Sequence, residues 1–401
     1  MKSFPLPDVS AAHRLLRNLA ARIPNVAIHR VEQPLVLYGA GHLGRMAADL
    51  LQQLDVPIAY ALDRLPPSDG LLLGRIPVLT PEQAPLAHRN SHQVAVCVVT
   101  APYEPIYSDL VSMGWRQVDP VYDILDAYVD RLPMGNGWFA GALDDEDIGR
   151  IEQVLACWHD DYSRAAHLQF LAWRVHREEW HFSDAPVCID DRYFISPVRS
   201  ILQPDEYFLD AGAYHGMVIE RWLKLTRGLF REILAIEPDR NNAESLRIRI
   251  AKFPADVVER IRVLEYALGN FNEIQAFSHD LGLASRLAVQ ADGEIQVCQL
   301  DHLDFPVTFG KIHLEGGELK ALEGGVETLQ RHRPVLAVTL YHNRDGLWRI
   351  PTFLMELLPD YQFLLRLHGW CGTACVLYAI PNERSRHVFD SGDYDDPVNI
   401  Y

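Results

Sequence analysis

The chain has 401 residues, which is long enough for two or three domains of about 100 to 200 residues each. Its hydrophobic share of 48% is that of an ordinary globular protein, so a buried core is expected. A formal net charge of −17 would repel nucleic acid and anionic membrane over most of the surface, so we expect neither as the main partner.

Cysteine usage and hydropathy favour the cytoplasm. Six cysteines are spread thinly along the chain, and the sequence lacks the charged and then apolar leader that marks a signal peptide. No apolar run approaches the roughly 20 residues that a membrane span needs. We therefore expect a reduced, cytoplasmic protein.

The first predicted domain, residues 1–125, is built around a glycine turn. After an amphipathic helix over residues 11–23, a short apolar strand at 34–38 runs into a G-x-G-x-x-G turn and a helix. The helix N-terminus would offer unpaired amide groups to a phosphate, and an acid after the next strand stands where a ribose hydroxyl would be met. The residues of this candidate nucleotide site are Gly39, Gly41, Gly44 and Asp63.

An alternative interpretation of the same turn is purely structural. Residues 94–99, 103–113 and the segment around Val118 predict a strand, a helix and a strand, which would complete a small three-layer Rossmann-like domain. The sequence offers room for only one mononucleotide-binding unit, whereas a full dinucleotide domain repeats it. The glycines can then simply let helix and strand pack closely.

Residues 126–190 are predicted to form a helical connecting region. Acids at 144–147 suit the positive end of a helix dipole and open a helical stretch that is expected to continue to His181. Its aromatic side chains are expected to pack in a core or between domains. They are Trp158, Phe170, Trp173 and Trp180.

The third unit, residues 191–401, begins with a buried strand that ends at an acid and breaks into a glycine turn, YFLDAGAYHG. Asp210 closes the apolar run, and Gly212 and Gly216 allow a close backbone approach that a side chain would block. About 20 residues further on, a second apolar run ends at Glu237, the spacing at which an open α/β sheet presents a carboxylate to a ribose. Two neighbouring parallel strands would then hold a nucleoside between them.

Alternation of apolar strands with helices continues to the end of this unit. Further strands are expected at residues 261–268, 309–314, 334–340, 362–367 and 376–380, and a hairpin at 274–278 and 294–300 around a loop at 282–285. Helices are expected at residues 217–227, 241–253, 318–331 and 347–358. Near-continuous apolar strands of this kind predict a parallel sheet that is covered on both faces. The predicted fold class is α/β, with two Rossmann-like three-layer units.

Three motifs in this unit resemble the FkbM-type family of S-adenosylmethionine-dependent methyltransferases. The family motif D-x-G-A-x-x-G is matched by Asp210, Gly212, Ala213 and Gly216. The signature K-x-D-x-E-G-x-E is matched by residues 311–325, KIHLEGGELKALEGG, except that His313 stands where the family usually has aspartate. Residues 340–351, LYHNRDGLWRIP, are similar to the family's segment after the fifth strand. The resemblance spans roughly residues 191–381 and implies a seven-stranded methyltransferase sheet with an antiparallel edge.

The resemblance also implies S-adenosylmethionine as the cofactor. Glu237 would accept both ribose hydroxyls, the glycines would let backbone amides approach the methionine part, and Asp210 would order the turn or hold the amino group. The expected cofactor-binding residues are Asp210, Gly212, Ala213, Gly216 and Glu237.

Methyl transfer to oxygen needs aligned, dry reactants and removal of a proton from the acceptor. His313 can serve as the base because its unperturbed pKa of about 6.5 is already suitable, and His342 is the other candidate. Glu315 and Glu318 would bind the acceptor or cap the helix that starts at Glu318. The replacement of the family aspartate by His313 can equally mean a changed acceptor or a lost activity, and a metal requirement stays open.

The leading hypothesis is O-methylation of a hydroxyl on a small-molecule acceptor, a sugar or secondary metabolite, where the acceptor class is implied by the resemblance. One alternative is a non-catalytic protein in which either Rossmann-like unit senses a nucleotide, which His313 favours. Another is an oxidoreductase that uses NAD at residues 39–44, which the short first domain counts against.

Overall fold

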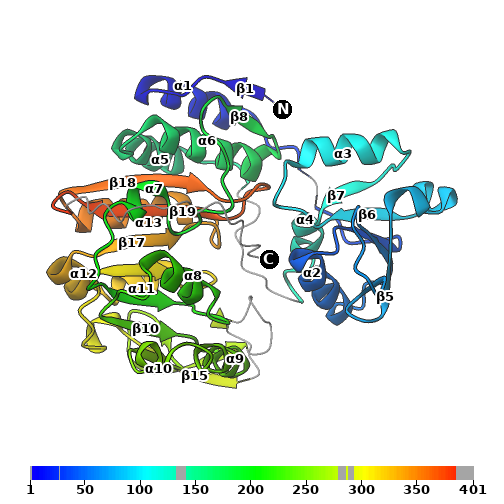
Figure 1. The fold of residues 1–401 in the computed structure, drawn as a ribbon. Helices are drawn as coiled ribbons and strands as arrows, with labels where there is room; N and C mark the ends of the chain where they lie inside the picture. Colours follow the sequence, from blue (N-terminus) through cyan, green and yellow to red (C-terminus); the bar gives the residue numbers. More distant parts are fainter. Residues whose placement is uncertain (1, 27, 132–140, 279–285, 288–292, 385–401) are drawn as a thin grey trace.

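The computed structural model describes residues 2–26, 28–131, 141–278, 286–287 and 293–384 (Figure 1). It contains two α/β bodies, a smaller one near the N-terminus and a larger one in the C-terminal half. A layer of helices from the central region lies along one side of the larger sheet (Figure 1). None of the described helices is long and apolar enough to span a membrane.

The smaller body has a doubly wound sheet. Among the described residues its strand order is β4-β5-β3-β2-β6-β7, and all neighbours are parallel except β4 and β5. Counted by appearance, the five parallel strands follow the order 3-2-1-4-5, so the chain changes direction across the sheet between β2 and β6. The strands are β2 (Leu35–Tyr38), β3 (Ile58–Leu62), β4 (Leu71–Leu72), β5 (Ile76–Leu79), β6 (Gln93–Val96) and β7 (Val118–Pro120).

Three helices belong to this sheet, and they are α2 (His42–Gln53), α3 (Tyr103–Ser112) and α4 (Val121–Asp126). Strands β4 and β5 were not predicted, because both are short and lie between turn residues. With β5 in place, the sheet carries three parallel strands on the β2 side of its switch point, which make one mononucleotide-binding unit as the sequence indicated, and β6 and β7 on the other side.

The larger body confirms the predicted methyltransferase sheet. In the described part of the chain, seven strands follow the order β11-β10-β9-β16-β17-β19-β18, and β19 runs antiparallel to both of its neighbours. Counted by appearance, this order is 3-2-1-4-5-7-6. The strands are β9 (Tyr207–Ala211), β10 (Glu232–Ile236), β11 (Ile261–Leu264), β16 (Phe309–Ile312), β17 (Val335–Thr339), β18 (Tyr361–Leu367) and β19 (Cys375–Pro381).

Helices cover both faces of this sheet, as the continuous apolar strands require. They are α7 (Ser196–Arg199), α8 (Met217–Thr226), α9 (Arg240–Ile250), α10 (Ala255–Val258), α11 (Glu318–Glu323), α12 (Val326–His332) and α13 (Gly346–Leu357). The single helix expected at 318–331 is two helices, because Gly324 and Gly325 interrupt it. A Cβ at Gly324 would lie 1.9 Å from the carbonyl oxygen of Gly269, so the break lets the chain pass that backbone.

A small second sheet is inserted between β11 and β16. Its order is β12-β15-β13-β14, and the expected hairpin is confirmed as the antiparallel pair β13 and β15. The loop expected at 282–285 lies outside the described residues. The strands are β12 (Ala267–Leu268), β13 (Ile274–Ser278), β14 (Arg286–Leu287) and β15 (Gly293–Cys298).

The helical stretch expected from residue 144 to 181 is two helices, α5 (Asp145–Cys157) and α6 (Asp161–His176). The break occurs because Asp160 caps a second helix, with its carboxylate accepting from the Ser163 amide. Strand β8 (Trp180–Phe182) follows and pairs in parallel with β1 (Lys2–Phe4). Helix α1 (Val9–Ala20), which the sequence grouped with the first domain, shares its buried face with α5 and α6.

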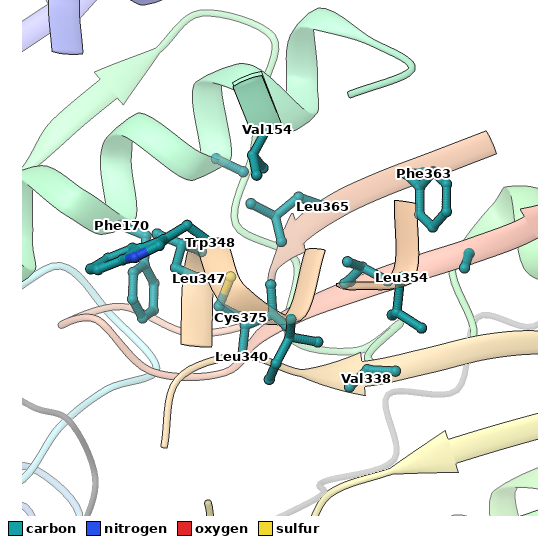
Figure 2. Close-up of a cluster of buried hydrophobic side chains, with 14 of the residues drawn as sticks. Val154, Phe170, Val338, Leu340, Leu347, Trp348, Leu354, Phe363, Leu365 and Cys375 are labelled. Atoms are coloured by element: carbon teal, nitrogen blue, oxygen red, sulfur yellow. The ribbon is translucent and has the colours of Figure 1, made fainter. Parts of the chain in front are cut away.

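The central helices and the methyltransferase sheet share one hydrophobic core. Figure 2 shows Val154 and Phe170 of the helical layer together with Trp348 of α13, Leu365 of β18 and Cys375 of β19. Helix α6 is buried along almost its whole length. The expectation that its aromatic side chains pack in a core is therefore confirmed for Phe170, which is 5% exposed. The helical layer thus packs against the sheet on the side of β18.

Candidate active site

The carboxyl ends of β16 and β17 bring three predicted site residues together. His313 follows β16, His342 follows β17, and Glu315 lies in the turn before α11. Because β16 and β17 are parallel neighbours, the segments after them leave the sheet at the same edge. One potential ligand atom from each of the three side chains lies within 4.8 Å of the other two. We refer to His313, Glu315 and His342 as the histidine site.

The two imidazole rings are directed toward the carboxylate of Glu315. Nε2 of His313 lies 2.9 Å from Oε1 of Glu315, and Nε2 of His342 lies 3.5 Å from Oε2. The rings themselves are stacked, with centroids 4.9 Å apart. The other nitrogen of each ring faces a different partner: Nδ1 of His313 lies 2.7 Å from the hydroxyl of Tyr193, and Nδ1 of His342 lies 2.5 Å from Oε1 of Glu318.

Glu318 is a buried anchor for this turn. Its carboxylate accepts hydrogen bonds from the amides of Leu314 and Gly316, both at 3.0 Å, and from the hydroxyl of Thr339 at 2.8 Å. The side chain is 1% exposed. Glu318 therefore holds His342 and the turn in place, and direct acceptor binding by this residue is not what the structure favours.

Burial and neighbouring charges separate the two histidines. Burial, then the charge of His342, lowers the pKa of His313 well below its ordinary value. Burial alone would also lower the pKa of His342, but the carboxylates of Glu315 and Glu318 outweigh it and raise that pKa. Burial alone would raise the pKa of Glu318, but the charge of His342 and its hydrogen bond lower it. His313 is therefore the neutral imidazole of the pair.

Three residues that the sequence analysis did not select complete the surroundings. The hydroxyl of Tyr341 lies 3.4 Å from Nε2 of His313, and Nη2 of Arg192 donates to that hydroxyl at 2.9 Å. Tyr193 contacts the other side of the His313 ring. Arg192 and Tyr193 come from the segment before β9, far from His313 in the sequence, and no local pattern could have indicated them.

Asp210 is fully buried and forms an ion pair with Lys311 of the neighbouring strand. Nζ of Lys311 lies 2.9 Å from Oδ1 of Asp210 and donates to the carbonyl oxygens of Gly212 at 2.6 Å and Ala211 at 3.2 Å. Neither Asp210 oxygen has a hydrogen bond of good geometry among the described residues, so Asp210 and Lys311 interact mainly through the attraction of their opposite charges. Of the two roles considered for Asp210, the structure favours ordering of the turn.

The glycine turn after β9 is shaped by close packing. Gly212 has φ +78°, and a Cβ there would lie 1.9 Å from the carbonyl oxygen of His313. Gly216 has φ +80°, and its Cβ would lie 2.7 Å from a methyl carbon of Leu246. The amides of Gly212 and Ala213 both donate to the carbonyl oxygen of Ile236, at 2.9 and 3.0 Å. These two amides are thus used inside the protein, which departs from the expectation that the glycines free them for a ligand.

Glu237 stands where the sequence analysis expected it, after β10 and against the glycine turn. Its Oε2 accepts from the amide of Tyr214 at 2.7 Å, and its Oε1 accepts from the amide of Asp239 at 3.1 Å. The residue is 5% exposed. Burial raises the pKa of Glu237, and the hydrogen bonds from those two amides oppose that rise.

The smaller body repeats this arrangement around Asp63. The carboxylate of Asp63 accepts from the amide of Ala40 at 2.7 Å and from the amide of Leu65 at 2.8 Å. A Cβ at Gly44 would lie 2.0 Å from the carbonyl oxygen of Gly39, so Gly44 is required for packing. A Cβ at Gly41 would meet nothing within 4 Å. Close packing explains Gly44, whereas Gly41 is free of that constraint.

The carboxyl edges of the two sheets face each other, which the sequence did not reveal. The amide of Trp370, in the loop after β18, donates to the carbonyl oxygen of Val99, which follows β6, at 2.7 Å. The pKa of Tyr122 in α4 is raised first by burial and then by the charges of Tyr341 and Glu315, so this tyrosine lies near the histidine site. The smaller body therefore contributes to the surroundings of that site.

A sheet of strand order 3-2-1-4-5-7-6 with a glycine turn after its first strand and an acid after its second defines a Rossmann-like methyltransferase domain. Residues 210–365 match the family model described as the methyltransferase FkbM domain. Residues 210–365 therefore form an FkbM-type methyltransferase domain, which confirms the resemblance found in their motifs.

The crystal structure of methyltransferase FkbM from Methylobacillus flagellatus KT is similar over most of the chain. The two proteins are 20% identical, the match covers 93% of this chain and 100% of the other, and the TM-score is 0.62. The shared fold thus includes the smaller body and the helical layer. A match also covers 48% of this chain and 90% of a SAM-dependent methyltransferase from Aquifex aeolicus, at 11% identity and a TM-score of 0.31. No curated protein matches the sequence.

Proposed function

We propose that the protein transfers the methyl group of S-adenosylmethionine to a hydroxyl oxygen of a small molecule, a sugar or secondary metabolite. The family match supports methyl transfer, and the observation that supports oxygen as the acceptor is the histidine site. A hydroxyl must lose its proton on methylation, and His313, Glu315 and His342 are the groups at the sheet edge that can assist this loss.

Glu237 and the turn after β9 are the proposed donor site. Oε1 of Glu237 accepts the amide of Asp239 and, at 3.4 Å, the side-chain amide of Asn242, whereas Oε2 accepts the amide of Tyr214 and keeps a lone pair that would accept a ribose hydroxyl. The ion pair of Asp210 and Lys311 would hold the turn after β9 in place, because Lys311 also donates to the carbonyl oxygens of Ala211 and Gly212. Positioning of the sulfonium and the acceptor in line can supply up to roughly 7 to 11 kcal/mol of the barrier reduction.

The chemical step is a displacement at the methyl carbon. The acceptor oxygen forms a bond to that carbon, the carbon–sulfur bond breaks, and S-adenosylhomocysteine leaves with the electron pair on sulfur. The acceptor proton would pass to the histidine site, where His313 is the neutral imidazole and Glu315, 2.9 Å from its Nε2, would stabilise the cation that forms. His342 and Glu318 would hold that arrangement.

The first domain is proposed to bind part of the acceptor. Its glycine turn and Asp63 repeat the geometry of the donor turn and Glu237, and its carboxyl edge faces the histidine site. A nucleotide or sugar nucleotide held there would direct its far end toward the methyl donor. The net charge of −17 supports a small-molecule acceptor over nucleic acid.

Calorimetric titration with S-adenosylmethionine, S-adenosylhomocysteine and NAD tests the donor, and transfer of a labelled methyl group to a panel of hydroxylated acceptors tests the reaction. Glu237→Gln should weaken S-adenosylhomocysteine binding about 10- to 150-fold, the equivalent of one charge-assisted hydrogen bond. The exposed Glu356→Gln is the matched control. Donor binding without turnover on any acceptor would favour a sensing protein, and binding of NAD alone would favour an oxidoreductase.

A further inference from the structure

We propose that His313, Glu315 and His342 bind one divalent first-row transition metal ion. The binding site follows from the geometry of these side chains alone. The role of the ion, which is to activate the acceptor hydroxyl in place of a free imidazole, rests on the proposed function.

The spacing of the three side chains suits a single ion. Metal–ligand bonds of about 2.1 Å place adjacent ligand atoms roughly 3.0 to 3.4 Å apart. Oε1 of Glu315 lies 2.9 Å from Nε2 of His313, and Oε2 lies 3.5 Å from Nε2 of His342. One ligand atom from each of the three side chains lies within 4.8 Å of the other two, so small shifts of these side chains bring the atoms to this spacing. The side chains of His313 and Glu315 are 17% and 19% exposed, so an ion has a route into the site.

The outer nitrogen of His342 is arranged as in histidines that bind metals. Its Nδ1 faces the buried carboxylate of Glu318, which holds a ring proton there, so that loss of the other ring proton on metal binding turns an Nε2 lone pair toward Glu315. That Nε2 is buried, and it has no hydrogen-bond partner within the described ranges, although Glu315 is 3.5 Å away. A metal ion that accepts the lone pair of this buried nitrogen would explain why it has no hydrogen bond.

His313 can adopt the same state. Its Nδ1 lies 2.7 Å from the hydroxyl of Tyr193, which can either donate to that nitrogen or accept from it. A shift of the ring proton from Nε2 to Nδ1 therefore keeps the Tyr193 hydrogen bond and frees Nε2 for the ion.

The backbone around Glu315 is held in an unusual conformation. Glu315 has φ +48°, in the left-handed region that non-glycine residues seldom adopt, and Gly316 follows with φ +102°. Glu318 accepts the amides on both sides of Glu315, from Leu314 and Gly316. Strained residues of this kind persist where the surroundings fix them, and here the result is a carboxylate aimed between the two imidazoles.

The donor set indicates the type of metal. Two imidazoles and one carboxylate suit zinc, iron, manganese, cobalt or nickel, whereas magnesium and calcium prefer oxygen ligands. Three protein ligands leave positions for the acceptor oxygen, and a bound cation lowers the pKa of a coordinated hydroxyl. Cationic side chains close to the site have other partners: Lys311 pairs with Asp210, Arg192 donates to the Tyr341 hydroxyl, and Arg174 donates to the Tyr341 carbonyl oxygen.

The test is metal binding by the full chain after treatment with a chelator. Calorimetric titration with Zn²⁺ or Mn²⁺ should show one ion per chain, and Co²⁺ should give visible absorption bands from nitrogen ligation. Glu315→Gln should weaken Zn²⁺ binding at least about 100-fold, because loss of an outer partner alone typically costs 10- to 100-fold. Glu318→Gln, which removes only such an outer partner, should weaken it about 10- to 100-fold. Glu356→Gln and His302→Asn change exposed residues of the same types and should bind as the original chain does.

His313→Asp restores the residue usual in the family and gives a second variant. It should shift the preference from Zn²⁺ toward Mg²⁺, because one nitrogen ligand is replaced by oxygen. Failure to bind Zn²⁺, Mn²⁺ or Co²⁺ more tightly than roughly 1 mM, or equal affinity in Glu315→Gln with circular dichroism unchanged, would overturn the metal site. Metal binding with no binding of S-adenosylhomocysteine would overturn the proposed function instead and leave the metal site standing.

Discussion

Nδ1 of His342 lies 2.5 Å from Oε1 of Glu318, and each side chain is 1% exposed. The same carboxylate accepts the amides of Leu314 and Gly316 and the hydroxyl of Thr339. All of these partners are hydrogen-bond donors, and an ionised carboxylate can only accept hydrogen bonds. The carboxylate of Glu318 therefore organises the turn between β16 and α11. The geometry of the histidine site therefore depends on Glu318, a residue that need not touch the substrate.

Glu318→Gln should lower the free energy of unfolding by about 1.5 to 3 kcal/mol, the value of a hydrogen bond to a charged group. The amide –NH₂ of glutamine would have to face one of the donors that now surround the carboxylate. Urea unfolding followed by circular dichroism measures the change, with the exposed Glu356→Gln as the control. Equal midpoints for both variants would show that the buried carboxylate does not stabilise the turn.

The ion pair of Asp210 and Lys311 gives a second prediction. Asp210→Ala should cost about 3 to 5 kcal/mol, because it leaves a buried ammonium without its counter-charge. The double variant Asp210→Ala with Lys311→Met should lose less than Asp210→Ala alone, since the charge itself is then gone. Chemical denaturation of the three proteins gives the comparison. A double variant that is less stable than Asp210→Ala would contradict this account.

Much of the larger sheet could be predicted, because its apolar strands and the acids that end them are local features of the sequence. His313 was selected because it replaces the family aspartate and can act as a base, and His342 was selected as the other candidate base. The parallel pairing of β16 with β17 is what brings them together. Their contacts with Arg192 and Tyr193 could not be foreseen, since those residues lie before β9 and reach the site only through the fold.

The sequence could not predict that the carboxyl edges of the two sheets face each other. It depends on contacts between distant segments, such as the ion pair of Asp123 in α4 with Arg177 after α6, each 11% exposed, and the hydrogen bond from Trp370 to Val99. None of these residues belongs to a motif. The break between α5 and α6 was missed for a local reason, because residues 144–181 were predicted as one helical stretch without Asp160 being considered as a helix cap.

Two glycines from corresponding turns should respond differently to alanine. Gly212→Ala places a Cβ 1.9 Å from the His313 carbonyl at φ +78°, so the turn must move and the free energy of unfolding should fall by more than about 2 kcal/mol. Gly41→Ala meets nothing within 4 Å and should change it by less than about 1 kcal/mol. Thermal or urea unfolding distinguishes them. A similar loss in both variants would show that Gly212 is not required for the close approach of the chain after β16.

Glu237 predicts a specific dependence of stability on pH. Burial raises its pKa in the folded protein, whereas in the unfolded chain it titrates near its ordinary value of about 4.3. As the pH rises above that value, the unfolded chain releases the proton first and binds fewer protons than the folded state. The contribution of Glu237 to stability is therefore greatest at low pH and falls until the pH has passed the folded pKa.

Glu237→Gln cannot titrate at this position. Its amide must also face the donors Tyr214 and Asp239, which adds a cost that does not change with pH. The free energy of unfolding of the variant minus that of the original chain should thus increase as the pH rises from 4 and level off once the pH has passed the folded pKa, whatever its starting value. The total increase should be about 1.4 kcal/mol for each unit that the pKa is raised. Urea unfolding at several pH values measures this difference. The same measurement on Glu356→Gln should give a flat line, and a flat or falling line for Glu237→Gln would mean that Glu237 is stabilised as the carboxylate even without the ribose.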